Sequence, residues 1–468
     1  MPSEEFARSD DRPVFPRDPG FPQLEVAGDP VRMLEVFRAH LEPLPGRACV
    51  ILDCLPFRFR CRQSTSRCVL QYTLRLSDPE TGRQWDQWVT GLIYSEPGAA
   101  QAVWHRLRSS DLAAEIPEPW RQLQPVSFVP ELDMVIEVFP FDRRLPQLGQ
   151  VLNGATRDLE PLLLALLGPG DWHAGPATLE PRRYRAELGA VLRYALPARD
   201  AASGRSASTS CYLKVYRNRE GEATFDRLRA WSERAGRQPP GYSLVRPLAY
   251  WSELRTLVLE EAQGISLHER LLEDSDPEAA VRAVARALAG LNQDQLPIER
   301  VHVLADQIDQ LKRASALIQW ACPEKRAKIG GVSAVVARSL EEVAPAPFHR
   351  DLTTEHALVS GDQVSFIDTD SIAMGDPVRD PALLFAHIAS TVALHSVPRE
   401  RALAIGTAFV EEYFAHVPAS WRKRFRLHCA GAFIEVAAGI FRAQPPAWQE
   451  KVAQVAANAR HALAGEFG

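Results

Sequence analysis

The sequence contains two similar segments at a constant offset of 122 residues, and this repeat limits the possible folds more than any other feature. Residues 69–94 (VLQYTLRLSDPETGRQWDQWVTGLIY) and 191–216 (VLRYALPARDAASGRSASTSCYLKVY) share eight of 26 positions without a gap. One residue then drops out, so that AVWHRLR aligns with ATFDRLR, and the first offset returns where QPVSFVPEL aligns with RPLAYWSEL. Two copies are too few for a solenoid, so the repeat predicts a duplicated domain.

Both copies have the same order of expected elements. Alternating β-branched and polar residues predict strands joined by hairpins that contain glycine (DPETGR and DAASGR), then a helix, then further strands. After residue 272 the periodicity predicts long amphipathic helices, at 276–292, 302–320, 378–396, 399–415, 419–442 and 446–464. Only the stretch 345–368 interrupts this helical part with loop and strand segments. A sheet-rich part before a helical part predicts an α+β fold.

Composition limits the partners. Of 468 residues, 46% are hydrophobic and 24% charged, as in ordinary globular proteins, and the net charge of −5 does not favour binding to nucleic acid. No apolar run approaches the roughly 20 residues of a membrane span. The acidic, proline-rich residues 1–28 contain no apolar signal-peptide core, so we expect a disordered tail on a cytoplasmic protein.

Lysine is rare in this chain. There are 48 arginines and six lysines, and Lys214 is the only lysine among the first 311 residues. A lysine ammonium is a compact point charge that suits phosphate oxygens, whereas arginine presents a planar fork. A single lysine in a strand is also a common protection against edge-to-edge association. The rarity of lysine favours a functional role for Lys214.

Three aspartates lie in and after the stretch that interrupts the helices. FHRDLTTEH places Asp351 after an apolar run, and VSFIDTDSIAMGDP ends an apolar strand at Asp368, with Asp370 two residues later. Such carboxylates can accept a hydroxyl proton and hold a hard divalent cation. An isolated His-Arg-Asp triplet is common by chance, and Asp370 is equally consistent with an ordinary loop acid.

Two further aspartates follow. Asp376 precedes Pro377, which is typical of a helix start with an N-cap and a proline at the first helical position. Asp380 is expected to stabilise the conformation of the loop around Asp351 without taking part in the reaction itself.

Taken in order, a strand lysine, a helix glutamate, an extended connector, HRD, and then ID…D…GDP…D resemble the aminoglycoside phosphotransferase and choline kinase family. The resemblance covers about residues 175–465 and implies a protein-kinase-like fold with two lobes. We therefore expect an amino lobe with its hinge at 167–272 and a helical carboxy lobe at 273–468. The first repeat copy, 29–166, is expected to be a degenerate cap domain that resembles an extra amino lobe.

The resemblance also implies roles for the loop residues. Asp351 would be the catalytic base, with His349 of the same loop among the catalytic residues. Asp368 would be the Mg²⁺ ligand, together with Asp370 and His356. His356 stands where the family has asparagine, and an imidazole nitrogen suits Mn²⁺ and other transition metals better than Mg²⁺.

The nucleotide site is implied in the same way. Lys214 would contact the α- and β-phosphates of ATP, with Glu222 as its ion-pair partner, and the backbone of Glu260 and Ala262 would meet the adenine. No Gly-rich phosphate loop is evident in EPRRYRAELGAVL. In the first copy, Leu92 replaces the lysine and a glutamine replaces the glutamate, which predicts a cap without nucleotide.

The expected activity is ATP- and Mg²⁺-dependent transfer of the γ-phosphate to a hydroxyl of a small molecule: a sugar, an aminoglycoside or an amino alcohol. The main alternative is a pseudokinase that binds a nucleotide or a protein partner without turnover, with the cap domain as the expected partner surface. A protein kinase is a third alternative, which the GDP…D pattern after Asp368 disfavours. We expect neither nucleic acid nor a membrane as a partner.

Overall fold

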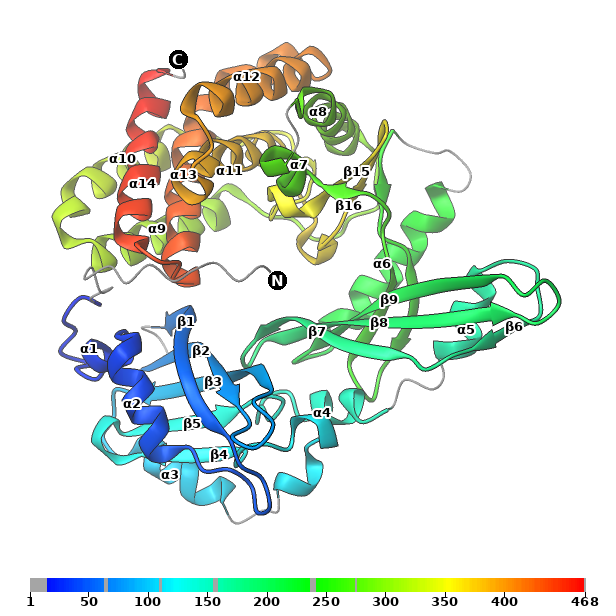
Figure 1. Cartoon of the computed structure of the whole chain (residues 1–468). Helices are drawn as coiled ribbons and strands as arrows, with labels where there is room; N and C mark the ends of the chain where they lie inside the picture. Colours follow the sequence, from blue (N-terminus) through cyan, green and yellow to red (C-terminus); the bar gives the residue numbers. More distant parts are fainter. Residues whose placement is uncertain are drawn as a thin grey trace. The chain divides into compact units, whose positions relative to one another are not determined.

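The computed structural model describes residues 15–62, 66–108, 112–154, 159–235, 241–273 and 276–466 (Figure 1). The chain divides into two compact units. Unit 1 takes in the chain up to Phe141, together with Leu317–Ala327 and Ala437–Gln454. Unit 2 consists of Asp142–Ala316, Lys328–Val436 and Val455–Gly468.

Unit 1 contains an antiparallel five-stranded sheet with the order β1-β2-β3-β5-β4. Its strands are β1 (Val50–Arg62), β2 (Arg67–Ser77), β3 (Gln84–Tyr94), β4 (Val126–Val129) and β5 (Met134–Val138). The helices of this part are α1 (Leu24–Ala27), α2 (Pro30–His40) and α3 (Ala99–Leu107). Asp29 caps α2 by accepting the N–H groups of Val31 and Arg32, and Pro30 follows at the first helical position, where its missing N–H is not needed.

Unit 2 contains a six-stranded antiparallel sheet in which β11, β12, β9 and β8 follow one another, with β6 and β7 both paired to β8. Its strands are β6 (Trp172–Ala174), β7 (Thr178–Arg185), β8 (Gly189–Asp200), β9 (Ser206–Tyr216), β11 (Pro247–Trp251) and β12 (Thr256–Glu260). Shifted by 122 residues, β3 coincides with β9 and β5 with β12, and the strand order of unit 1 is repeated. The repeat in the sequence therefore corresponds to one strand order used twice.

Most of the remaining helices follow the six-stranded sheet of unit 2 in the sequence. After α4 (Gln147–Leu152), α5 (Leu159–Leu166) and α6 (Glu220–Ala235) come α7 (Leu267–Glu273), α8 (Glu278–Gln293), α9 (Leu304–Ala321), α10 (Arg326–Ser339), α11 (Arg379–His395), α12 (Arg399–Ala415), α13 (Arg422–Ala443) and α14 (Trp448–Ala464). The predicted α+β class is confirmed. Helix α10 was not predicted, because two adjacent glycines in RAKIGGVSAVVARS weaken the helical signal.

Two small sheets in unit 2 hold the loops that carry the aspartates. One has the order β10-β16-β15-β13, and the other pairs β14 with β17. Their strands are β10 (Ser243–Leu244), β13 (Ile265–Ser266), β14 (Ala346–Phe348), β15 (Ala357–Ser360), β16 (Gln363–Phe366) and β17 (Ala373–Gly375). The segment 349–356 therefore runs from β14 to β15, and the segment 367–372 runs from β16 to β17.

The predicted disordered tail is wrong for residues 15–28. Phe15 is 2% exposed, and its ring lies 4.8 Å from that of Phe59 and 5.8 Å from that of Phe441, centroid to centroid. Phe21 and Leu24 are buried as well, so the apolar residues among the prolines and acids order this segment. Residues 1–14, the rest of the predicted tail, lie outside the described residues. Within the described ranges, no helix is both long enough and apolar enough to span a bilayer.

Candidate active site

The loop that carries Asp351 is held in place by hydrogen bonds to the side chain of Asp380. The buried Asp380 carboxylate accepts the backbone N–H groups of His349 at 2.6 Å and Arg350 at 2.8 Å, and the Asn292 side-chain amide at 3.2 Å. Burial raises the pKa of Asp380, although these donors oppose the rise. Arg350 has a φ of 74°, a left-handed conformation that an arginine adopts only when its neighbours hold it there. The predicted supporting role of Asp380 is confirmed.

Asp351 itself is exposed, as a base that meets a substrate must be. His349, two residues earlier, is 0% exposed, and its Nε2–H donates to the carbonyl oxygen of Ile367 at 2.9 Å. Burial lowers the pKa of His349, so the ring is neutral near pH 7. His349 therefore ties two loops of the site together and does not lie where it would touch a substrate, unlike the catalytic role predicted for it.

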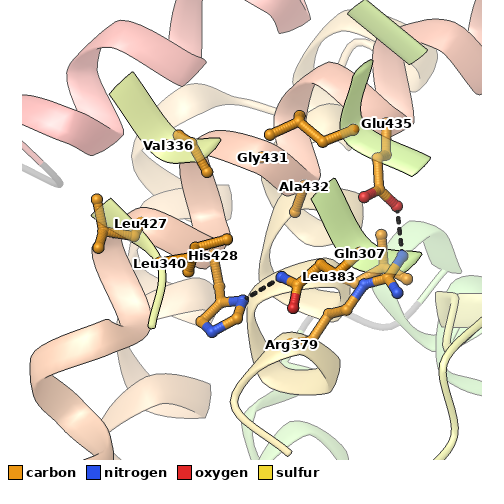
Figure 2. Close-up of a pocket in the computed structure, with 11 residues that line it drawn as sticks. Gln307, Val336, Leu340, Arg379, Leu383, Leu427, His428, Gly431, Ala432 and Glu435 are labelled. Carbon is orange, nitrogen blue, oxygen red and sulfur yellow. Dashed lines mark hydrogen bonds and ion pairs between the residues drawn. The ribbon is translucent and has the colours of Figure 1, made fainter. Parts of the chain in front are cut away.

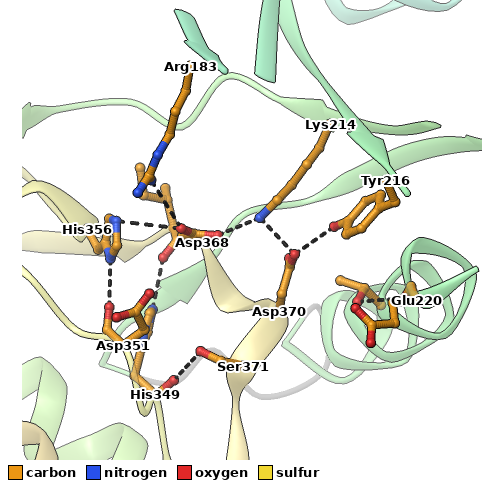
Figure 3. Close-up of polar contacts among 12 residues, drawn as sticks. Arg183, Lys214, Tyr216, Glu220, His349, Asp351, His356, Asp368, Asp370 and Ser371 are labelled. Atoms are coloured by element: carbon orange, nitrogen blue, oxygen red, sulfur yellow. Dashed lines mark hydrogen bonds and ion pairs between the residues drawn. The ribbon is translucent and has the colours of Figure 1, made fainter. Parts of the chain in front are cut away.

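Lys214 joins the two acids that follow β16 (Figure 3). Its Nζ lies 2.5 Å from Oδ1 of Asp368 and 2.8 Å from Oδ2 of Asp370, and the hydroxyl of Tyr216 donates to the same Asp370 oxygen at 2.8 Å. In β9 the side chains of Cys211, Leu213 and Val215 are buried on one face of the sheet, so the two-residue period of a strand turns Lys214 to the other face.

The charges of this group stabilise one another. Burial alone would raise the pKa of Asp368, but the Lys214 ammonium and His356 lower it well below its ordinary value. Burial opposes the charge of Lys214, but Asp370 and Asp368 together raise its pKa. Asp368 and Lys214 are therefore both ionised at neutral pH.

Glu222 is not the ion-pair partner of Lys214 in this structure. It lies exposed in the first turn of α6, where the helix dipole favours a carboxylate, and no ion pair joins it to Lys214 in the described part of the chain. Asp368 and Asp370 take its place. The predicted pairing is thereby corrected, because the lysine side chain extends toward the loop acids and not toward α6.

Arg183 is a residue of the site that the sequence interpretation did not single out. It lies on β7, and its Nη1 is 3.6 Å from Oδ2 of Asp368 (Figure 3). The signal was present in EPRRYRAELG, the stretch without a Gly-rich loop, which contains three arginines. Tyr216, which binds Asp370, was also missed, although it lies only two residues from Lys214 in the same strand.

Glu260 and Ala262 lie at the end of β12 and just beyond it, where a connector leads to the helical part. The N–H of Glu260 donates to the Arg246 carbonyl at 2.9 Å, so this N–H is not free for a purine. Gly264 ends the connector at φ 120°, where an added Cβ would lie 2.9 Å from backbone atoms of Val359. Only glycine fits there.

The three residues predicted to bind a metal are only partly brought together. Asp368 and Asp370 both converge on the Lys214 ammonium, which shows that the two carboxylates can share one cation. His356 Nε2 lies 3.6 Å from Oδ2 of Asp368, while its Nδ1–H donates to the Asp351 carbonyl at 2.7 Å. Across the described ranges no cluster of three or more His, Cys, Asp or Glu side chains is placed to hold a metal. The two aspartates fit a divalent cation, with His356 beside them.

A small pocket lies among α9, α10, α11 and α13 in unit 2 (Figure 2). Its polar lining groups already bind one another: Gln307 donates to Nδ1 of His428 at 3.0 Å, and Arg379 pairs with Glu435 at 2.8 Å. His428 Nε2–H in turn donates to Asp376 at 2.8 Å. These contacts fix the segment that leads from Asp376 into α11, so we assign the pocket a supporting role.

Asp376 was predicted to be the N-cap of a helix that begins at Pro377, but α11 begins at Arg379. Its carboxylate receives two hydrogen bonds from Arg424, both of 2.9 Å, in addition to that from His428. Burial alone would raise the pKa of Asp376, but these partners lower it strongly overall. One oxygen also accepts the N–H of Val378 at 3.1 Å, which retains part of the predicted local role.

Residues 199–424 match the sequence model of the phosphotransferase enzyme family abbreviated APH. The predicted family resemblance is confirmed. The matched segment contains Lys214, Asp351, Asp368 and Asp370, so the converging side chains all lie within it. The coarser functional prediction, a phosphotransferase of the type that acts on small molecules, follows from this match. A search of curated protein sequences finds no match.

Solved structures that are similar to this chain include these three. A choline/ethanolamine kinase family protein from Mesorhizobium loti is 15% identical and aligns over 66% of this chain and 94% of its own, with a TM-score of 0.39. A putative aminoglycoside phosphotransferase from Ralstonia eutropha is 12% identical and aligns over 66% of this chain and 98% of its own, with a TM-score of 0.43. A choline kinase from Streptococcus pneumoniae is 13% identical and aligns over 68% of this chain and 99% of its own, with a TM-score of 0.41. The resemblance to the family rests on the sequence match of residues 199–424.

Proposed function

We propose that this phosphotransferase-family protein transfers the γ-phosphate of ATP to a hydroxyl group of a small molecule, with Mg²⁺ or Mn²⁺ as the cation. The observation that carries the proposal is the convergence of Lys214, Asp368 and Asp370 next to the loop of the exposed Asp351. A lysine for phosphate oxygens, acids for a cation and an open carboxylate for a hydroxyl proton are the parts that phosphoryl transfer needs.

The proposed step is a direct displacement. The hydroxyl oxygen of the acceptor forms a bond to the γ-phosphorus, the bond from that phosphorus to the β–γ bridging oxygen breaks, and ADP leaves. Asp351 receives the hydroxyl proton. Lys214, once ATP is bound, exchanges one of its carboxylate partners for phosphate oxygens, and Arg183 approaches the same oxygens from β7. A divalent cation between Asp368 and Asp370 would neutralise charge on the transferring group.

The adenine is proposed to lie against the backbone of Glu260 and Ala262. Unit 1 is proposed to bind no nucleotide, because Leu92, which corresponds to Lys214 in the repeat, is 0% exposed in its sheet. Calorimetry should therefore detect one ATP site per chain. A protein partner at the first repeat copy stays a prediction.

The test is acceptor-dependent ADP release across sugars, aminoglycosides, amino alcohols and hydroxy acids, with wild type and Asp351→Asn. The variant should lose about 10²–10⁴-fold in turnover, since general base catalysis has that magnitude, while ATP binding is retained. Asp362→Asn is the matched control, because Asp362 is an exposed acid in the turn between β15 and β16.

His356 at the asparagine position favours one alternative, a pseudokinase that binds nucleotide without turnover. ATP binding with no ADP release from any acceptor would favour that alternative. Equal turnover of wild type and Asp351→Asn would contradict the assignment of the base.

A further inference from the structure

Two arginines from distant parts of the chain donate to the same carbonyl oxygen beside the site. Nη1 of Arg300, which precedes α9, lies 2.9 Å from the carbonyl oxygen of Asp370, and Nη2 of Arg227 in α6 lies 3.4 Å from the same atom. Two guanidinium groups on one neutral acceptor repel each other, because a carbonyl dipole offsets only part of their charge. Burial and the nearby Arg300 both lower the pKa of Arg227.

A third arginine, Arg350, lies beside them in the loop of the proposed base. It directly precedes Asp351, and burial, Arg379 and Arg300 together lower its pKa. The Asp370 carbonyl is also next to this loop, since the hydroxyl of the following residue, Ser371, donates to the His349 carbonyl at 3.0 Å (Figure 3). The three positive groups therefore border the loop of the proposed base.

The positive charge of these residues is offset only in part, by Asp370 and Glu220 near Arg227 and by Asp351 and Asp306 near Arg350. None of them has a carboxylate within ion-pair distance among the residues that the structure describes. Several other arginines of unit 2 are paired with carboxylates, as in Arg424–Asp376, Arg379–Glu435, Arg282–Glu412 and Arg234–Asp294. The carboxylate of Asp370, whose carbonyl accepts from Arg227 and Arg300, is already occupied by Lys214 and Tyr216. A guanidinium has five N–H donors, so most donors of Arg300 remain available for a ligand.

We propose that Arg227, Arg300 and Arg350 bind an oxyanion carried by the acceptor, so that the substrate is a phosphorylated or carboxylated alcohol. The planar fork of arginine matches the paired oxygens of phosphate and carboxylate. Like charges make the same three residues unfavourable neighbours for cationic acceptors, which include aminoglycosides and amino alcohols. This inference rests on the proposed function and narrows its acceptor class.

The first experiment measures anion binding without turnover. Wild type is titrated with inorganic phosphate in a calorimeter, with and without a saturating non-hydrolysable ATP analogue. The double variant Arg227→Gln/Arg300→Gln should bind phosphate at least about tenfold more weakly, because charge-assisted hydrogen bonds are lost. Arg229→Gln should bind as wild type does, since Arg229 lies on the same helix, is 59% exposed and pairs with Asp226.

Two results would overturn the site. One is equal phosphate binding by wild type and the double variant. The other is loss of phosphate binding when the ATP analogue is present, because the anion would then occupy the nucleotide's own phosphate site. Circular dichroism and the thermal midpoint establish that the double variant is folded. Arg227→Lys, which keeps the charge and loses the fork, serves as a second variant and should bind with intermediate affinity.

The second experiment assigns the anion to the acceptor. ADP release is measured with glucose, glucose 6-phosphate, glucuronic acid and glucosamine, which share hydroxyl groups and differ in charge. Release should be greatest with one of the two anionic sugars, and comparison of these two separates phosphate from carboxylate. Arg300→Gln should raise the KM for that sugar about tenfold while the KM for ATP is unchanged.

Greatest release with glucosamine would overturn the inference and leave the proposed phosphotransferase intact. No release with any sugar, together with phosphate binding that depends on Arg227 and Arg300, would leave the anion site standing. The proposed activity would then be the part that fails.

Discussion

The Lys214 ammonium lies 2.5 Å from Oδ1 of Asp368, across a separation of 154 residues in the chain. The same nitrogen is 2.8 Å from Oδ2 of Asp370, so one cation bridges the two acids. This arrangement brings a strand of the sheet and a loop of the helical part to a single point. ATP and a divalent cation would compete with these ion pairs for the same atoms.

Replacement of Lys214 tests this competition. Lys214→Arg keeps the charge but replaces a compact ammonium with a larger planar group, so we expect a KM for ATP at least about tenfold higher, or a comparably lower kcat. Steady-state kinetics with ATP as the varied substrate measure the effect. Lys312→Arg is the control, because Lys312 is an exposed lysine of α9. An unchanged KM and kcat for Lys214→Arg would argue against phosphate contact.

Arg183 is expected to bind nucleotide phosphates in place of a Gly-rich loop. Arg183→Ala should raise the KM for ATP several-fold, because the guanidinium that lies 3.6 Å from Asp368 is removed. The neighbouring Arg182 is an internal control, since it is exposed and pairs with Glu180 at 3.0 Å. If Arg182→Ala and Arg183→Ala raise the KM equally, the effect is general surface charge and not a specific contact.

His356 is expected to set the metal preference. Its Nδ1–H is held by the Asp351 carbonyl, so Nε2 is the ring nitrogen that faces Asp368. An imidazole nitrogen suits Mn²⁺ better than Mg²⁺, so wild type should be more active with Mn²⁺ and should need more free Mg²⁺ than His356→Asn. The measurement is a titration of activity with each ion.

The control for the metal titration is His268→Asn. His268 contacts Thr354 of the same loop at 3.2 Å, so its replacement disturbs the loop without changing a side chain next to Asp368. Identical metal curves for wild type and His356→Asn would show that His356 is only a loop residue.

The free energy of unfolding should fall in mild acid, because His302 is buried in its neutral form. This ring is 8% exposed, and its Nε2 accepts a hydrogen bond from Arg379 at 2.9 Å, so it must be neutral there. Burial, with Arg379 and Arg350 nearby, lowers the pKa of His302 to about 4 from 6.5, and Asp306 only partly opposes this. Below pH 6.5 the unfolded chain binds a proton that the folded chain does not, so acid favours unfolding until about pH 4.

The expected loss at pH 5 is roughly 2 kcal/mol in the free energy of unfolding, at 1.36 kcal/mol for each pH unit below 6.5. Urea unfolding at pH 7.5 and pH 5 measures it. His302→Gln keeps an acceptor for Arg379 and does not titrate, so its stability should change less between the two pH values. His173→Gln, at an exposed histidine of β6, should behave as wild type does. A pH dependence that His302→Gln leaves unchanged would assign the acid sensitivity to other groups.

The sequence by itself determined that one order of strands and helix occurs twice along the chain, and where each loop acid lies in the sequence. The 122-residue offset predicted two sets of strands, and β3 and β9 coincide under that offset. Asp351, Asp368 and Asp380 were found because short-range spacing sets where a strand ends and a loop begins. Strand periodicity likewise placed Lys214 on a different face from Leu213 and Val215.

Only the tertiary structure decided which charged groups meet. Lys214 pairs with Asp368 and Asp370 and not with Glu222, and Arg227 and Arg300 converge on one carbonyl although 73 residues separate them. The physical reason is that periodicity along the chain reports which face of an element is buried. It does not report which distant element packs opposite the other face, and ion pairs across the site depend on that packing.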